Sequence, residues 1–237
     1  VSYNVHLKPL VKKDSNRFIK LDTKTQQLIL DVQKGLSLRE WSVNGQSILG
    51  TLSHGFFDDI SLAADFYSCH SVIEPQGKHK ISDLCMVEPW IVDDLDGHYR
   101  IRVKCNVNDY SFNKQYLISK YENEFIIDQS IEIAYRSKAL IRSCHFTLIP
   151  GIWDQNTLFY ESTLGGTAPE KFMLRNKSID HSGILNQLVS SRFGFGVTTG
   201  KFRIGDKHHS ILIQHDPTEA ALIPHLVYLP QKNKTFM

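Results

Sequence analysis

The stretch that decides the fold class is YRIRVKCNV, residues 99–107. Its apolar residues alternate with the cations Arg100, Arg102 and Lys104. A period of two is typical of a β-strand with one face in a core and the other face in water. We therefore predict a strand over residues 99–107, in a sheet that is covered on one side.

Similar runs lie on both sides of this stretch. Downstream are SFNKQYLIS (111–119), EFIIDQSIEIAYR (124–136) and KALIRSCHFTLIP (138–150). Upstream, residues 26–50 hold two strand-like runs and then Asn44-Gly45, a pair that accepts the positive φ angles of a tight hairpin turn. No segment carries a convincing apolar stripe of helical period over a dozen residues. This pattern predicts an all-β fold, a large antiparallel β-sandwich, which we expect to form a single domain over residues 1–237.

The composition limits the classes of partner. Hydrophobic residues make up 41% of the 237-residue chain and charged residues 22%, which is ordinary for a globular protein. The formal net charge is +2 and the lysines and arginines are scattered singly, so no nucleic-acid partner is indicated. No apolar run approaches the roughly 20 residues that span a bilayer, so no membrane partner is indicated either. The chain begins with Val1 and ends abruptly, and we expect it to be a fragment of a longer polypeptide.

The four cysteines are too far apart in the sequence for a CxxC metal or redox motif. They are Cys69, Cys85, Cys105 and Cys144. The sequence does not fix the cellular compartment, but we favour a reducing one, such as the cytoplasm.

The stretch LSHGFFDDISLAADFYSCH, residues 52–70, gathers histidines and aspartates that include His54, Asp58 and His70. Their spacing matches neither a helical HExxH site nor a calcium loop, so we predict no metal and no cofactor. One interpretation is a loop whose aspartates bond backbone N–H groups while its aromatic residues fill a small core. The alternative is that His54 and Asp58 line a sugar-facing groove.

Residues 149–174 contain Trp153, Tyr160 and Glu161 within nine positions. Aromatic faces stack on sugar rings and carboxylates bind hydroxyl groups, so this set suits a carbohydrate surface. The alternative is that the aromatic residues belong to the core and that Glu161 is solvated.

His145 shares a strand face with Ser143 and Thr147 in the run 138–150. Such a histidine can serve as a general acid on a concave sheet, or it can be held by hydrogen bonds to its hydroxyl neighbours.

Three segments of the sequence resemble a β-sandwich domain of large glycoside hydrolases. They are KGLSLREWSVNGQSILGTLSHGFFDD (34–59), ISLAADFYSCHSVIEPQGKHKISDL (60–84) and LFYESTLGGTAPEKFML (158–174). The resemblance is to the galactose-mutarotase-like "supersandwich" class, as found in the α-amylase-like family 57 group, and runs from about Leu28 to the end. It implies a domain that is itself non-catalytic, that supports a catalytic domain of the same polypeptide, and that adds to the surface for an oligo- or polysaccharide.

Two alternatives stay open. Aldose 1-epimerases share this fold class, and an enzyme of that kind, or a glycosidase, would use His54, His70 or His145 as acid and Glu161 as base. The epimerase motifs are absent around these histidines, so that assignment rests on fold analogy. The third interpretation is a structural interaction module.

Overall fold

The structure is a computed structural model whose contacts divide the chain into two compact units, Val1–Thr147 and Leu148–Met237. It describes residues 12–14, 17–52, 67–87, 90–133, 138–149, 151–175, 177–181, 194–220, 222–228 and 230. The prediction of a single domain over 1–237 stays a prediction.

The first sheet of the N-terminal unit is a five-stranded antiparallel meander in chain order. Its strands are β1 (Lys12–Asp14), β2 (Phe18–Asp22), β3 (Gln26–Asp31), β4 (Ser37–Val43) and β5 (Gln46–Gly50). The predicted tight turn joins β4 to β5, where Asn44 and Gly45 have φ angles of 51° and 77°. A single 3₁₀ turn, η1 (Val32–Lys34), joins β3 to β4 and ends at Gly35 in the left-handed conformation.

The second sheet has the order β11-β10-β9-β8, and its neighbouring strands are antiparallel. Its strands are β8 (Trp90–Asp94), β9 (His98–Val107), β10 (Tyr110–Ser119) and β11 (Phe125–Ile133). The predicted strand over 99–107 is therefore β9. Ile101 and Cys105 are buried, whereas Arg102 and Lys104 are exposed, as the alternation requires.

A third sheet completes the unit in the order β12-β6-β7. Its strands are β6 (His70–Pro75), β7 (Ile81–Ser82) and β12 (Ala139–His145). The pairing of β12 with β6 shifts register between Arg142 and His145. Such a bulge bends the strand and redirects the side chains around it.

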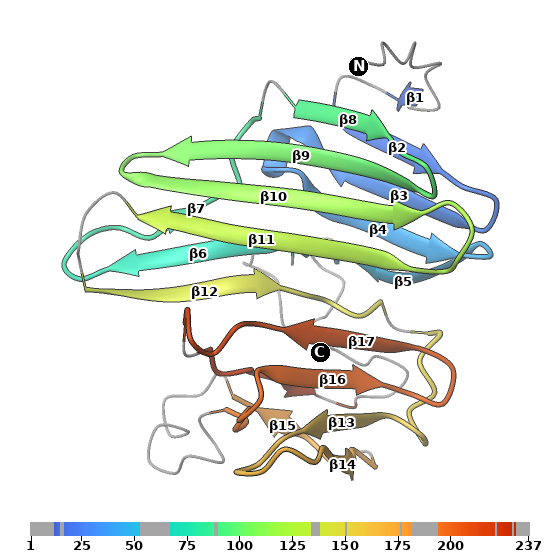
Figure 1. The fold of residues 1–237 in the computed structure, drawn as a ribbon, viewed down its shortest axis with the longest axis vertical. Coiled ribbons are helices and arrows are strands. Elements are labelled where there is room, and N and C mark those ends of the chain that lie inside the picture. Colours follow the sequence, from blue (N-terminus) through green and yellow to red (C-terminus); the bar gives the residue numbers. More distant parts are fainter. Residues whose placement is uncertain are drawn as a thin grey trace. The chain divides into compact units, whose positions relative to one another are not determined.

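The first and second sheets form two layers within this unit, with β9–β11 lying over β2–β5 (Figure 1). Aromatic side chains fill the space between the layers. Trp41 of β4 lies 5.5 Å from Phe125 of β11, and Phe125 stacks on Tyr116 of β10 at 6.0 Å between ring centroids. This packing explains the aromatic and aliphatic residues of the inward register of β10, which Lys114 interrupts.

The C-terminal unit contains a four-stranded antiparallel sheet in the order β14-β13-β16-β17 and a two-stranded sheet, β15 with β18. The strands are β13 (Phe159–Ser162), β14 (Glu170–Met173), β15 (Ile179–Asp180), β16 (Lys201–Gly205), β17 (Ser210–Gln214) and β18 (Val227–Tyr228). Tyr160 packs against three phenylalanines, Phe172, Phe195 and Phe202, with ring centroids 4.3–6.1 Å apart.

The all-β prediction is confirmed, because antiparallel sheets and one short 3₁₀ turn make up the regular structure of the described ranges. No helix in that part of the chain has the length and apolar character needed to cross a membrane.

Candidate functional site

A shallow groove of about 480 Å³ crosses β9, β10 and β11 on the face of the second sheet that points away from the first. The polar side chains that line it are Arg102, Lys104, Asn113, Gln115, Asp128 and Ser130, and residues Val103 and Lys114 also line it. The strand register arranges the polar residues in two rows. Arg102 pairs with Gln115 and Gln115 with Asp128. Lys104 pairs with Asn113 and Asn113 with Ser130.

Hydrogen bonds and ion pairs along this face hold several of the groups in place. Arg102 forms an ion pair with Asp93 at 3.0 Å, and Lys104 forms one with Glu132 at 3.4 Å. The amide nitrogen of Asn113 donates to Glu132 Oε1 at 3.1 Å. Cations, carboxylates and amides therefore alternate across the groove, and their charges are locally balanced.

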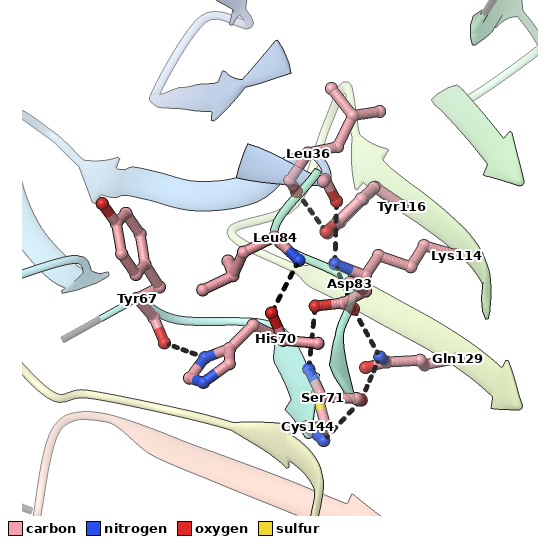
Figure 2. Close-up of polar contacts among 12 residues, drawn as sticks. Leu36, Tyr67, His70, Ser71, Asp83, Leu84, Lys114, Tyr116, Gln129 and Cys144 are labelled. Atoms are coloured by element: carbon pink, nitrogen blue, oxygen red, sulfur yellow. Dashed lines mark hydrogen bonds and ion pairs between the residues drawn. The ribbon is translucent and has the colours of Figure 1, made fainter. Parts of the chain in front are cut away.

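Beneath the groove, on the inward side of the same sheet, lies a buried polar cluster (Figure 2). Lys114 of β10 lies 2.8 Å from Asp83 Oδ2, and neither side chain is exposed. Lys114 Nζ also donates to the carbonyl oxygen of Gly35 at 2.8 Å. A buried charge needs this kind of pairing, because loss of hydration otherwise makes it very unfavourable.

Asp83 is bound by polar groups from two more strands. Its Oδ1 accepts from the backbone N–H of Ser71 at 3.1 Å, and Gln129 Nε2 lies 3.5 Å from its Oδ2. Gln129 Nε2 also donates to Ser71 Oγ at 2.5 Å. Tyr116 lies two residues after Lys114 on the same face of β10, and its hydroxyl group donates to the carbonyl oxygen of Leu36. Burial raises the pKa of the Tyr116 phenol well above its usual value. The cluster thus links β10 and β11 to β6 and to the turn after η1.

Two of the three histidines proposed as general acids lie together. His70 and His145 are directly paired across β6 and β12, with ring centroids 5.4 Å apart. His70 Nδ1 donates to the carbonyl of Tyr67 at 2.6 Å, and His145 Nε2 lies 3.2 Å from the hydroxyl of Thr147.

The imidazole pKa values of this pair are depressed. Loss of hydration among the surrounding residues is the main reason that the pKa of His145 is lowered to about 4, and the charges of the nearby His70 and Arg142 contribute to the same shift. Burial also lowers the pKa of His70, although the carbonyl of Tyr67 opposes the change. Both rings are therefore neutral at pH 7, which suits hydrogen bonding and the role of base better than that of general acid.

The residues proposed for sugar binding in the C-terminal unit do not form one surface. Trp153 is only 7% exposed and packs edge-on against His209 at 5.6 Å. Tyr160 lies in its aromatic stack, and burial raises the pKa of its phenol. Glu161 follows Tyr160 in β13, so its side chain points to the opposite face. There it lies 3.7 Å from Arg203.

His54 and Asp58 lie outside the described residues. Within the described ranges, no three or more His, Cys, Asp or Glu side chains are grouped so as to hold a metal ion.

The groove over β9–β11 was not among the sequence predictions, although its signal was present. The outward positions of YRIRVKCNV and SFNKQYLIS carry cations and amides, and the antiparallel register of the two strands brings these positions side by side. In the comparisons with known proteins, no family model, no curated protein and no solved structure matches this chain.

Proposed function

We propose that this chain is a carbohydrate-associated β-sandwich domain, itself non-catalytic, that binds an oligo- or polysaccharide along the groove over β9–β11. The observation that carries the proposal is the chemistry of the groove: two cations, two amides, a carboxylate and a hydroxyl lie on one sheet face. Sugar hydroxyls both donate and accept hydrogen bonds. Amide groups can also donate and accept hydrogen bonds, whereas guanidinium and ammonium groups only donate them. A carboxylate accepts hydrogen bonds at both of its oxygen atoms, so it can bind two hydroxyl groups at once.

The setting of these groups supports the proposal. They stand on three paired strands, and the buried Lys114–Asp83 ion pair ties the inward side of β10 to the residues behind it. A rigid backbone lowers the entropy lost when a ligand orders the binding groups.

The wider assignment rests on the resemblance of residues 34–84 and 158–174 to sandwich domains of glycoside hydrolases. On that basis the chain belongs to the galactose-mutarotase-like class and supports the catalytic domain of a larger polypeptide. That catalytic domain is then its protein partner.

Isothermal titration of the chain with maltooligosaccharides and other glycans tests the binding. The informative variants are Gln115→Ala and Asp128→Ala, both on the outward face, and the control is Gln46→Ala on β5. Loss of one hydrogen bond to a charged group costs about 1.5–3 kcal/mol, so Asp128→Ala should weaken binding by about 10- to 100-fold. An unchanged affinity in both groove variants, or no binding of any glycan, would reject the proposal.

A second candidate function, aldose 1-epimerase-like catalysis, draws support from the pairing of His70 with His145. It requires one imidazole to exchange a proton with a sugar ring. Polarimetry on α-glucose and α-galactose tests it: His145→Gln should abolish an acceleration of mutarotation that the unaltered chain shows. A rate equal to the background for the unaltered chain would exclude this function.

A further inference from the structure

A second pocket in the N-terminal unit has a volume of about 280 Å³ and lies at one end of the first sheet. The strand register builds it. Phe18 at the start of β2 pairs with Asp31 at the end of β3, and Asp31 pairs with Ser37 at the start of β4. All three residues line the pocket. None of them lines the groove over β9–β11, so this pocket is a separate site.

Two aromatic residues, Phe18 and Tyr67, line this pocket, and both are half-buried. Tyr67 comes from a part of the chain outside the first sheet. It is held beside β4 because the next residue, Ser68, forms an isolated bridge with Leu38, whose N–H donates to the Ser68 carbonyl at 2.9 Å. Aromatic residues in a pocket offer apolar contact to the body of a small ligand.

The lining of the pocket includes an ion pair. Arg17 donates from Nε and from a terminal guanidinium nitrogen to Asp31 Oδ2, at 2.9 and 2.7 Å. Asp31 Oδ1 accepts from the backbone N–H of Gln33 at 3.0 Å, which fixes the carboxylate at the start of η1. The charges of Arg17 and Asp31 therefore balance each other.

The second arginine of the lining, Arg39, has no carboxylate partner in the described part of the chain. It is the extra residue of a β-bulge, because the pairing of β4 with β3 passes from Leu38 directly to Glu40. A bulge redirects the side chains around it. The Arg39 guanidinium makes one long contact, 3.5 Å to the carbonyl oxygen of Thr51. Its positive charge is thus left for a group that enters the pocket.

Ser37 places a hydroxyl group at the same pocket. Its side chain is fully buried, and its hydroxyl oxygen has no hydrogen-bond partner among the described residues. Buried polar groups of native proteins nearly always have a partner. Because Ser37 lines the pocket, an acceptor atom bound there would supply the missing contact.

We propose that this pocket binds the carboxylate group of a small organic acid, with Arg39 and Ser37 as its hydrogen-bond donors. The planar guanidinium group matches the two oxygen atoms of a carboxylate, and such charge-assisted pairs are the stronger hydrogen bonds of proteins. Phe18 and Tyr67 then contact the ring or chain that carries the carboxylate. The proposal does not depend on glycan binding at the groove over β9–β11.

The charges at the pocket favour a ligand with one negative charge. Arg17 and Asp31 cancel, so Arg39 gives the described lining a net charge of +1. Lys34 adds positive potential nearby, with its ammonium nitrogen 5.4 Å from the ring centroid of Tyr67. A singly charged carboxylate should therefore bind more tightly than a doubly charged oxyanion, whose larger hydration cost the pocket compensates only in part.

The experiment follows the arginine side-chain N–H signals of the folded chain by NMR at constant ionic strength. The probes are benzoate, an acid on an aromatic ring, glucuronate, an acid on a sugar ring, and sulfate. We expect saturable shifts of the Arg39 signal with benzoate, glucuronate or both, and weaker binding of sulfate. The acid that binds more tightly identifies the kind of ring that the pocket accepts.

Arg39→Gln removes the charged donor and should weaken binding of the acid by about 10- to 100-fold. The matched control is Arg142→Gln, which removes the same charge from an exposed position on β12, outside the pocket, and should leave the affinity unchanged. Neither variant should alter the titration of the groove with maltooligosaccharides.

Ser37→Ala keeps the test independent of folding defects. The Ser37 hydroxyl has no partner in the described part of the chain, so its removal should not lower the urea midpoint. It should still weaken binding of the acid by about 3- to 10-fold, the effect of one neutral hydrogen bond. Absence of saturable binding by both acids, tighter binding of sulfate than of either acid, or an affinity unchanged by Arg39→Gln and Ser37→Ala would each overturn the proposal.

Discussion

Lys114 and Asp83 form an ion pair 2.8 Å long in which neither side chain is exposed to solvent. The two residues are separated by 31 positions in the sequence, and the pair connects the middle of β10 to the turn after β7. It lies directly behind the proposed binding face, so its loss should affect both stability and the positioning of the groove.

Removing one partner of this pair leaves the other charge buried and uncompensated. We expect Lys114→Met and Asp83→Asn each to lower the free energy of unfolding by about 3–5 kcal/mol. Urea unfolding followed by tryptophan fluorescence measures the change. The double variant Lys114→Met/Asp83→Leu removes both charges and should be more stable than Lys114→Met alone; equal or lower stability would contradict this account of the pair.

Gly35 should tolerate no side chain. A Cβ built at this position would lie 1.8 Å from the carbonyl oxygen of Asp83, and the φ angle is +63°. Gly35→Ala should therefore cost about 2–5 kcal/mol of stability, through left-handed strain and displacement of the Asp83 turn. Gly45→Ala is the matched control, because Gly45 also has a positive φ but a Cβ there meets nothing within 4 Å. Equal losses in the two variants would show that the contact with Asp83 is unimportant.

The histidine pair predicts a pH dependence of stability. The pKa of His145 in the folded chain is lowered to about 4, below the roughly 6.5 of an unfolded histidine, so the unfolded state binds more protons between these values. The free energy of unfolding should fall as the pH decreases from about 6.5 to 4, and His145→Gln should flatten this slope. The side chain of His145 is exposed at the surface, which reduces the size of the effect on stability but not its sign. Urea unfolding at several pH values measures this dependence. An identical slope in the His145→Gln variant would show that His145 is not its source.

The contribution of Asp206 to stability should change at a lower pH than that of His145. Burial opposes ionisation of its carboxyl group, but the backbone N–H groups of Asp154, His208 and His209 donate to it at 2.7–2.8 Å and lower its pKa. Its stabilising contribution is present at neutral pH and is lost as the pH falls below the usual carboxyl range.

Asp206→Ala should lower the stability of the C-terminal unit by about 1–3 kcal/mol, because three backbone donors lose their acceptor. Thermal unfolding at pH 7 measures this loss. The exposed Asp216, which bonds Thr218 in a similar turn, is the control, and Asp216→Ala should have the smaller effect. The reverse order would contradict the role given to Asp206.

The strands were predictable because alternation and turn residues are local signals. β9, and the Asn44-Gly45 turn, follow directly from the periods and residue types of their segments. Lys114 shows where this reasoning ends. It occupies the inward register of β10 between Phe112 and Tyr116, so its burial can be inferred from the pattern, but its partner Asp83 lies in an irregular turn that no periodicity predicts.

The site was harder to predict than the fold for the same reason. Trp153, Tyr160 and Glu161 are close in sequence. Tyr160 and Glu161 are neighbours in β13, however, so their side chains point to opposite faces of the sheet. The groove residues come from three strands, and only their pairing register brings them together.

The central claim is that the groove over β9–β11 binds a glycan, and mapping of backbone amide shifts by NMR tests it most directly. Addition of the tightest-binding oligosaccharide from the titration should move the amide signals of Arg102, Gln115 and Asp128 and of their neighbours on the three strands. The signals of β13 and β16 should stay in place. Shifts confined to the C-terminal unit, or no shifts at a saturating glycan concentration, would contradict the account.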